Sequence, residues 1–460
     1  MLIVINAVGL TPRLLQYAPR LKQIADRTAM RPMQDILPAV TMSAQATLLT
    51  GKPVNEHGIV GNGWLFRETN EIRFWQQSNR QMQSEPVYQT ARNEAARRGR
   101  KFKTAKMFWW FNQGAAVDIS VTPKPHYGID GSKAFGISST PPDLAGALET
   151  KLGKFPFAAF WGPMAGAKSS AWIAQASAEV VRTEKPDLTL VYVPHLDYDP
   201  QRFGPSGCNM QQQVQQLDDI CAPLLDAAQA EGADVWVVSE YGHCDVNTVV
   251  YPNRHLREAG LLQVRSGPFG EQLETYQSKA FAVCDHQVAH VYVADHADIP
   301  LVWACLEAIP GVGKLISGNT KKEYHLNHQR AGEIIMLSQP NAWFAYPFWL
   351  DDREAPDYAR CVAIHNKPGY DPCELFFDPR ITLPKLKVAW KLIQKMLGFR
   401  MKLDVVPLDG TIVKGSHGLI AENPLDGPLL IANNLPAGDS PLPMTYFRDH
   451  LLQHFDLLPE

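Results

Sequence analysis

Apolar residues in this chain form short continuous runs that alternate with longer amphipathic segments. The runs at residues 2–5, 157–161, 188–193, 235–239 and 429–432 have the length and the content of β-branched and aromatic residues typical of buried strands. The segments at residues 91–98, 171–182, 210–231 and 301–308 have the spacing of apolar positions typical of helices. This alternation predicts an α/β fold with a doubly wound, mostly parallel sheet and helices on both faces.

One region fits this alternation less well. Residues 279–293 and 333–337, with a helix between them, predict a small strand–helix–strand module. We therefore expect a first part of the core at residues 1–275, a small inserted α/β cap at 276–345, and a second part of the core at 346–460. Residues 343–379 are rich in proline and aromatic residues and lack periodicity, which is typical of a functional loop.

Composition and charge narrow the class of protein. The chain has 460 residues, of which 45% are hydrophobic and 20% are charged, as in ordinary globular proteins. The formal net charge of −3 provides no general basic field, so we expect no nucleic-acid polymer and no membrane as partner. A phosphorylated partner would be a small molecule that is held locally. The oligomeric state stays open.

The cysteines and the hydropathy suggest where the protein works. Seven scattered cysteines do not form a disulfide framework, and this favours a reducing compartment. The first residues lack the features of a signal peptide, and no segment approaches the length of about 18 apolar residues that a membrane span needs. We expect a cytoplasmic protein.

The most informative stretch, residues 41–64, places a hydroxyl between an extended segment and a helix. Residues 39–40 are predicted to end the extended segment, and residues 43–49 to form a short helix that Gly51 terminates. The hydroxyl of Thr41 would then face a helix N-terminus together with an anion or a metal ion. The alternative is an ordinary helix-capping threonine.

The same stretch carries a resemblance to a known family. Thr41 opens the helix and the run His57-Gly-Ile-Val-Gly-Asn62 follows it, which resembles the nucleophile segment of the nucleotide pyrophosphatase/phosphodiesterase group of the alkaline phosphatase superfamily. The resemblance spans most of the chain and implies an alkaline-phosphatase-like fold. It also implies that Thr41 attacks phosphorus, that a covalent intermediate forms, and that water then releases the product.

Four further family motifs have counterparts here, and most of them are altered. Asn6 replaces an aspartate at the end of the first strand. In residues 194–205 an aspartate is kept and a histidine becomes glutamine, and after the strand at 235–239 the usual Asp-His becomes Glu-Tyr. Residues 415–418 keep Gly-Ser-His-Gly. The resemblance thus implies metal ligands at Asn6, Asp197, Gln201, Glu240, Tyr241 and His417.

The altered ligand set leaves the metal open. Fewer imidazole and carboxylate ligands lower the affinity for zinc, so Zn, Mn or Mg, with one or two ions per chain, all stay possible. His195, His243 and His365, together with Asp285 and His286, are candidates to complete the set, and a structural role is the alternative for each of these histidines.

Two other segments are candidates for contacts with the substrate. Asn62 lies between two glycines whose backbone N–H groups could bind an anion, although a plain turn is the alternative. Lys367 lies in a Pro/Gly-rich loop with a histidine and two carboxylates, which is either an active-site wall or a structural latch. The aromatic clusters at residues 108–112 and 343–349 either line a substrate pocket or pack in the core.

These observations together predict a metal-dependent hydrolase of phosphate esters, most simply a phosphodiesterase or nucleotide pyrophosphatase with Thr41 as nucleophile. Two alternatives stay open. The first is another hydrolase of the same superfamily, acting on phosphonates, phosphomonoesters or sulfate esters. The second is a protein that binds a phosphorylated ligand without hydrolysing it.

Overall fold

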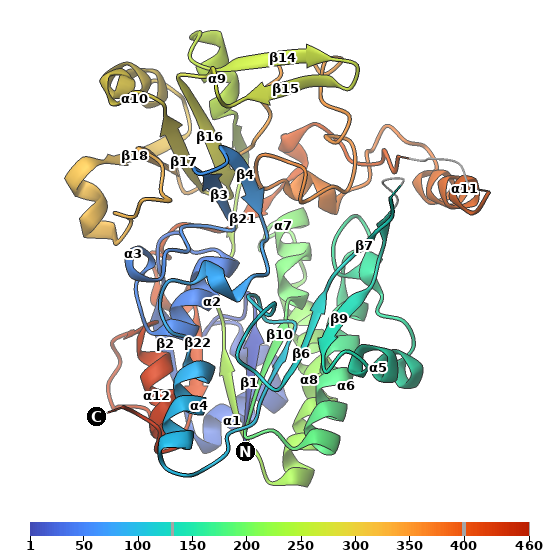
Figure 1. Ribbon diagram of the computed structural model, residues 1–460, viewed down its shortest axis with the longest axis vertical. Coiled ribbons are helices and arrows are strands. Elements are labelled where there is room, and N and C mark those ends of the chain that lie inside the picture. Colours follow the sequence, from blue (N-terminus) through green and yellow to red (C-terminus); the bar gives the residue numbers. More distant parts are fainter. Residues whose placement is uncertain (130–132, 398–401, 460) are drawn as a thin grey trace.

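The computed structural model describes residues 1–129, 133–397 and 402–459 (Figure 1). Its centre is a nine-stranded sheet in the order β23-β2-β22-β11-β1-β10-β5-β6-β9. These strands are β1 (Leu2–Ala7), β2 (Ala29–Gln34), β5 (Thr104–Met107), β6 (Ile119–Pro123), β9 (Ile137–Thr140), β10 (Leu188–Val193), β11 (Asp234–Val238), β22 (Leu429–Ala432) and β23 (Leu442–Pro443).

The middle of this sheet is parallel and buried on both faces. Strand β1 pairs in parallel with β10 and β11, and β10 pairs in parallel with β5. Every residue of β1 and β10 is buried, and for this reason both sequences are nearly continuous apolar runs. Strands β22 and β9 run antiparallel to their neighbours, so the sheet is mostly but not wholly parallel.

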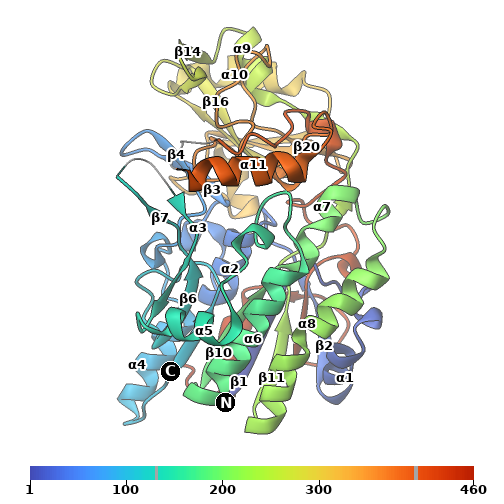
Figure 2. The same ribbon diagram turned by 90° about the vertical axis from the view of Figure 1, so that its right-hand side faces the viewer.

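Helices cover both faces of the sheet (Figures 1 and 2). One group contains α1 (Pro19–Arg27), α6 (Ala167–Glu184) and α8 (Met210–Glu231), in which α8 contacts both of the others. The other group contains α2 (Thr41–Thr50), α4 (Val87–Arg97) and α12 (Tyr446–His454), which contact one another. The expected α/β fold with a doubly wound sheet is confirmed.

A second, smaller sheet lies above the carboxyl ends of the central strands in Figure 1. It is antiparallel, with the order β16-β17-β19-β18, and is formed by β16 (Ala280–Asp285), β17 (Val288–Val293), β18 (Val312–Ser317) and β19 (Ile334–Ser338). Helices α9 (Pro252–Glu258) and α10 (Ile299–Glu307) pack beside it. Because α9 precedes residue 276, we propose that the inserted cap begins earlier than the boundaries 1–275, 276–345 and 346–460 assume.

Two expected elements differ from the structure. Residues 279–293 form two antiparallel strands instead of one, because His286 adopts a left-handed backbone conformation with φ of 60° in the two-residue turn between them. Residues 157–161 are not a strand, since Phe157–Ala159 forms a 3-10 helix after Pro156. The rings of Phe155, Phe157 and Phe160 cluster there, which explains the apolar run.

The remaining elements are short and connect these layers. The strands are β3 (Gly63–Phe66), β4 (Glu71–Phe74), β7 (His126–Tyr127), β8 (Lys133–Ala134), β12 (Cys244–Asp245), β13 (Thr248–Val250), β14 (Gln263–Gly267), β15 (Gly270–Glu274), β20 (Ala342–Phe344) and β21 (Gly415–Ser416). The helices are α3 (Val54–His57), α5 (Leu144–Leu152), α7 (Asp199–Phe203) and α11 (Pro384–Met396). In the part of the chain that is described, no helix has the length and apolarity needed to cross a bilayer.

Candidate active site

The candidate site lies at the carboxyl ends of the central parallel strands. Asn6 on β1 is in register with Tyr192 on β10, and Glu240 follows the end of β11. Parallel strands end at one edge of a sheet, so chemistry-bearing residues after different strands meet there. Asn6 and Glu240 are fully buried at this edge.

Thr41 is the first residue of α2, directly after the extended Val40 with φ of −133° and ψ of 156°. Its hydroxyl oxygen Oγ1 lies 2.9 Å from the hydroxyl oxygen of Tyr241. The backbone N–H of Met42 donates to Oδ1 of Asn62 at 3.0 Å. Asn62 therefore satisfies a free N–H at the start of the helix, and the hydroxyl of Thr41 is directed to Tyr241 instead of to the helix end.

A chain of hydrogen bonds leads from Thr41 through Tyr241. The hydroxyl of Tyr241 donates to Oδ1 of Asp197 at 3.2 Å. Nε2 of His243 lies 3.1 Å from the same carboxylate oxygen. The nucleophile candidate is thereby connected to a carboxylate and an imidazole through one phenol.

Asp197, His243 and His417 can together hold a metal ion. One ligand atom of each of the three lies within 4.8 Å of the ligand atoms of the others. Nδ1 of His417 lies 2.8 Å from the carbonyl oxygen of Ala39, which fixes a proton on Nδ1 and leaves the lone pair of Nε2 available. That Nε2 atom is buried and has no hydrogen-bond partner among the residues that the structure describes. These observations fit a metal-binding histidine.

The protonation state of His417 also favours metal binding. Burial, together with the neighbouring His286 and His243, holds the pKa of His417 well below its usual value. The imidazole is therefore neutral, which is the form that binds metal ions. The ring of Tyr241 stacks on that of His417 with centroids 3.7 Å apart, which fixes its orientation.

Asn6 and Glu240 form a second cluster beside Thr41. Nδ2 of Asn6 donates to Oε1 of Glu240 at 2.5 Å, and Nε2 of Gln45 donates to the same oxygen at 2.7 Å. Burial raises the pKa of Glu240 to about 8, although hydrogen bonds from Gln45, Asn6 and Thr41 oppose this shift. Within the described part of the chain, Oδ1 of Asn6 and Oε2 of Glu240 are buried without partners. Two oxygens thus stay available for a cation or a ligand.

Gln201 and His195 make contacts of a different kind. Nε2 of Gln201 donates to the carbonyl oxygen of Asp197 at 2.8 Å, and its Oε1 accepts from the hydroxyl of Tyr370 at 2.7 Å. The structure therefore uses both ends of this amide within the protein. Nε2 of His195 lies 3.2 Å from the carbonyl oxygen of Gln213, and burial lowers the pKa of His195 to about 4.

The loop that contains Lys367 lies beside the site. Lys367 is fully buried, and its Nζ lies 2.7 Å from a carboxylate oxygen of Asp371 and 2.7 Å from one of Glu374. This arrangement directs its charge to two internal carboxylates, as in a structural latch, and contact of Lys367 with substrate stays a prediction. His365 lines the cavity that opens beside the site, and its Nδ1 lies 3.4 Å from the carbonyl oxygen of Phe74.

The cap contributes Asp285 and His286, which the sequence offered as candidates to complete the ligand set. Oδ2 of Asp285 accepts from the backbone N–H of Asn62 at 2.7 Å, and Oδ1 of Asp285 lies 2.8 Å from Nδ1 of His286. The ring of His286 lies 3.8 Å from that of His417 and 3.8 Å from that of Tyr370. Sequence reasoning named Asp285 and His286 as candidates but placed them inside a strand, and it missed Gln45 and Tyr370. The adjacent Asp-His pair was the sequence signal for these two cap residues, and no comparable signal pointed to Gln45 or Tyr370.

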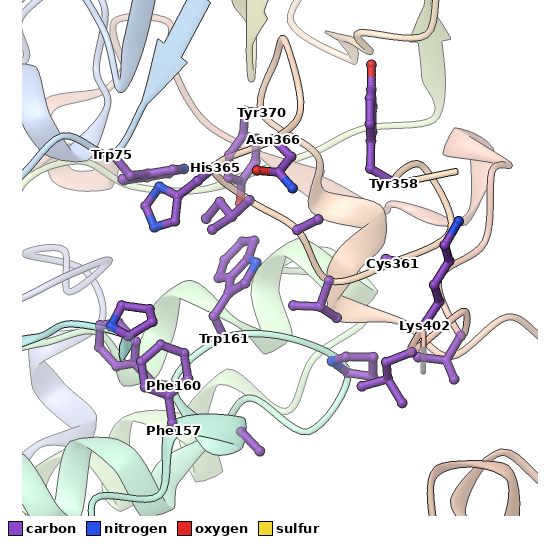
Figure 3. A pocket seen from close by; sticks show the side chains of 18 of the residues that line it. Trp75, Phe157, Phe160, Trp161, Tyr358, Cys361, His365, Asn366, Tyr370 and Lys402 are labelled. Atoms are coloured by element: carbon purple, nitrogen blue, oxygen red, sulfur yellow. The ribbon is translucent and has the colours of Figure 1, made fainter. Parts of the chain in front are cut away.

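A cavity of about 1430 Å³ opens beside these residues, and Thr41, Asp197 and His417 form part of its lining. Figure 3 shows the aromatic side chains that line it. The cavity places the candidate nucleophile and two of the candidate metal ligands against a space that is large enough for a substrate.

Comparison with solved structures shows the same fold. Phosphonoacetate hydrolase from Sinorhizobium meliloti 1021, solved in complex with phosphonoformate, is 16% identical, and the match covers 98% of this chain and 94% of that chain with a TM-score of 0.60. Murine ectonucleotide pyrophosphatase/phosphodiesterase 5 is 13% identical, and the match covers 100% of this chain and 96% of that chain with a TM-score of 0.59. The human form of the same protein is 13% identical, with coverages of 99% and 94% and a TM-score of 0.59.

The sequence comparison identifies the family. No curated protein sequence matches the chain. The model of the type I phosphodiesterase/nucleotide pyrophosphatase family matches residues 2–371, which is most of the chain. The chain is therefore a hydrolase of the alkaline phosphatase superfamily, and it belongs to the type I phosphodiesterase/nucleotide pyrophosphatase family.

Proposed function

We propose that this protein is a metal-dependent phosphodiester hydrolase in which Thr41 is the nucleophile. The observation that carries the proposal is the position of Thr41 at the start of α2, with its hydroxyl 2.9 Å from that of Tyr241 and in one cavity with Asp197 and His417. The family to which the chain belongs supports hydrolysis of a phosphorus ester.

Asp197, His243 and His417 would hold one divalent ion. Two imidazoles and one carboxylate suit Zn²⁺, and they leave at least one coordination position for substrate or water. Bound there, the ion would neutralise charge on the phosphate oxygens. Oδ1 of Asn6 and Oε2 of Glu240 provide only one amide and one carboxylate oxygen for a second ion, so we expect any second ion to bind weakly.

The residues around Thr41 account for the movement of its proton. Because the hydroxyl of Tyr241 donates to Asp197, its oxygen can accept the proton of Thr41. As Oγ1 of Thr41 forms a bond to phosphorus, the bond from phosphorus to the leaving oxygen breaks, and the proton of Thr41 passes through Tyr241 to Asp197. The leaving alkoxide takes up a proton from solvent, and Asp197 releases its proton to solvent. Water then forms a bond to phosphorus as the bond to Oγ1 of Thr41 breaks, and one proton of this water restores the hydroxyl of Thr41.

The direct test compares Thr41→Ala with Thr41→Ser on bis(p-nitrophenyl) phosphate. Because Thr41→Ala removes the covalent route, we expect turnover to fall at least about 1000-fold, whereas Thr41→Ser keeps measurable activity. Melting temperatures of both variants should stay close to that of the wild type, since Val40 and not Thr41 occupies the N-cap position. Near-wild-type turnover by folded Thr41→Ala would refute the proposal.

Hydrolysis of a phosphonate is the second candidate, because one structural neighbour with nearly full coverage is a phosphonoacetate hydrolase. Release of inorganic phosphate from phosphonoacetate, measured beside release of p-nitrophenol from the diester and from p-nitrophenyl phosphate and p-nitrophenyl sulfate, separates the candidate classes. Binding of these compounds without turnover of any would favour a ligand-binding protein instead.

We also propose a cytoplasmic location. All seven cysteines are free, at positions 208, 221, 244, 284, 305, 361 and 373. Free thiols are typical of a reducing compartment. Fractionation of cells that express the native gene, followed by immunodetection, tests this location.

A further inference from the structure

The cavity beside Thr41 is larger and more aromatic than a small polar substrate needs. Its volume is about 1430 Å³, whereas small-molecule sites typically measure about 300–1000 Å³. Trp75, Trp110, Phe160 and Trp161 belong to its walls. Figure 3 shows Trp75, Phe160 and Trp161 around the same open space.

This aromatic surface begins directly beside the catalytic residues. The ring of Tyr241 stacks on His417 at 3.7 Å, and His417 contacts His286 at 3.8 Å. His286 stacks on Tyr370 at 3.8 Å, and Tyr370 meets Trp75 edge-on at 6.0 Å. A substrate whose phosphate lies at Thr41 would therefore lay its ester group along a continuous wall of rings.

The fold holds Trp75 in an unfavourable backbone conformation. Its φ is 59°, and a bulky residue rarely adopts this left-handed region without a compensating constraint. The backbone N–H of Trp75 donates to the carbonyl oxygen of Asn62 at 2.9 Å, and this bond fixes Trp75 to the residue that also supports the start of α2. The position of this indole is therefore coupled to the position of the nucleophile.

Two indole N–H groups in the wall have no acceptor in residues 1–129, 133–397 and 402–459. Nε1 of Trp75 and Nε1 of Trp110 are both buried without a hydrogen-bond partner, and their rings lie 5.0 Å apart. The side chain of Trp75 is largely buried, with 8% of the residue exposed. A ligand with an acceptor oxygen within an otherwise apolar group would satisfy these donors.

The charges around the cavity limit how many phosphates the substrate carries. Among the described lining residues the cations are Arg265 and Lys402. Lys402 is ion-paired with Asp357, and Lys367 beside the site is ion-paired with two carboxylates. The wall thus offers little positive charge beyond a bound metal ion, which suits a substrate with one phosphate charge better than a nucleoside di- or triphosphate.

We propose that this cavity binds the apolar chain of an amphiphilic phosphodiester, a substrate with a single phosphate charge and one long apolar ester group, with Trp75 as a specificity-determining residue. This inference rests on the proposed phosphodiesterase function and names its substrate class. The indole N–H groups of Trp75 and Trp110 would donate to an acceptor oxygen in that group.

A series of p-nitrophenyl alkyl phosphates tests the proposal, because the charge and the leaving group stay constant while the alkyl group grows from methyl to octyl. We expect kcat/KM to rise by up to about fourfold for each methylene that becomes buried. Thymidine 5′-(p-nitrophenyl phosphate) should be a poorer substrate than the octyl ester. A flat series, or a preference for the thymidine ester, would overturn the proposal while leaving the phosphodiesterase function intact.

Variants link the effect to the cavity. Trp75→Ala should remove most of the dependence on chain length, measured as the ratio of kcat/KM for the octyl ester to kcat/KM for the methyl ester. Trp110→Phe keeps an aromatic ring and deletes the N–H, and it serves as the second test variant if Trp75→Ala does not fold. Tyr276→Ala is the control, because it removes an exposed aromatic side chain that does not line the cavity.

Binding to Thr41→Ala separates this proposal from the proposed function. Calorimetric titration of that variant with the same esters measures the affinity for the chain without turnover. If the wild type hydrolyses no ester while Thr41→Ala still binds the octyl ester at least tenfold more tightly than the methyl ester, the phosphodiesterase function fails and the chain-binding cavity stands. Equal affinities would overturn the cavity proposal.

A second and independent observation concerns the surface of α11. Leu383, Leu386, Trp390, Ile393 and Leu397 are exposed by 46–68%. Their spacing of three and four residues places them on one face of the helix. Figure 1 shows α11 projecting at the side of the molecule. Such a concentrated exposed apolar stripe marks an interaction site.

The charge of the same segment indicates the kind of partner. The sequence of residues 384–396 contains four lysines and no acidic residue. Lys387 and Lys391 pair with Asp404, and Val388 lines the cavity, so these residues anchor the side of the helix away from the apolar stripe. One aspartate faces two of the four lysines, so the segment keeps a net positive charge. An apolar face with Trp on a helix of net positive charge is typical of helices that lie in the interface of an anionic bilayer.

We infer that α11 docks on an anionic lipid bilayer, with its apolar stripe in the interface and without spanning the membrane. Sedimentation with vesicles of phosphatidylcholine alone, and with vesicles that contain 30% phosphatidylglycerol, tests this inference. We expect at least tenfold tighter binding to the anionic vesicles, and weaker binding at high salt.

The test variant and the control variant each carry two substitutions of an exposed apolar residue by glutamate. Leu386→Glu with Ile393→Glu should abolish binding to vesicles, whereas Leu301→Glu with Ile420→Glu, at exposed positions outside the stripe, should not. Absence of wild-type binding to the anionic vesicles would overturn the inference. So would a concentration-dependent dimer that the first double variant disrupts, because the stripe would then be an interface between two copies of the chain.

Discussion

The hydroxyl of Tyr241 lies 2.9 Å from Oγ1 of Thr41 and donates to Oδ1 of Asp197 at 3.2 Å. The resemblance to the family implied a metal ligand at Tyr241, where the family motif has histidine. Here a phenol connects the nucleophile candidate directly to a carboxylate. We therefore propose that Tyr241 passes a proton and does not bind a metal ion.

Tyr241→Phe tests this connection, because it deletes the hydroxyl and keeps the ring that stacks on His417. We expect kcat for bis(p-nitrophenyl) phosphate to fall about 100-fold with little change in KM, the effect typical of losing a proton-transfer group. The control is the melting temperature, which should change little. An unchanged kcat would show that Tyr241 only packs against His417.

Variants of His243 and His195 test which of these two histidines binds the metal ion. His243→Ala should reduce the affinity for zinc at least about 100-fold, because it removes one of the three ligands that converge among the described residues. His195→Ala should keep the metal, since His195 contacts the carbonyl oxygen of Gln213 instead. Elemental analysis after dialysis measures the stoichiometry, which we expect to be about one zinc per chain. Two tightly bound ions would contradict this expectation.

Asp35 predicts a dependence of stability on pH. Burial raises the pKa of its carboxyl group from 3.8 to about 7, and only the backbone N–H of Ala421 opposes this shift. A carboxyl group with a raised pKa in the folded state costs no stability below pH 3.8, and its cost grows as the pH rises to about 7.

Asp35→Asn should therefore stabilise the protein at pH 8 by at most about 4 kcal/mol and have little effect at pH 4. The amide oxygen of asparagine can still accept from Ala421. Urea unfolding at the two pH values measures the difference. Asp26→Asn, at an exposed residue, is the control, and an equal effect of Asp35→Asn at both pH values would contradict the prediction.

Lys367 should stabilise the wall of the cavity. Its ammonium group pairs with Asp371 and Glu374, and Glu374 also accepts from Nε1 of Trp161 at 2.6 Å. Lys367→Met leaves two carboxylates buried without their cation, which we expect to cost about 3–5 kcal/mol in the free energy of unfolding.

The matched control for this variant is Lys22→Met, which breaks an exposed ion pair with Asp26 and should cost less than about 1 kcal/mol. Chemical unfolding of both variants gives the comparison. If Lys367→Met were as stable as Lys22→Met but no longer bound phosphodiesters, Lys367 would be a substrate contact after all.

The sequence by itself determined the fold class and the position of the nucleophile candidate. Strands β1 and β10 are buried on both faces, so they had to be continuous apolar runs, and such runs are visible without a structure. The extended Val40, the helix that begins at Thr41 and its end at Gly51 follow from local signals that act within a few residues.

Only the tertiary structure decided which side chains meet at the site. His243 reaches Asp197 through the course of the loop after β11, whereas Gln201, a metal ligand implied by the resemblance, accepts a hydrogen bond from Tyr370. His286 enters from the cap, because a two-residue turn interrupts what the sequence predicted as one strand. These contacts join residues that lie far apart in the chain, and no local pattern of apolar and polar residues encodes such distances.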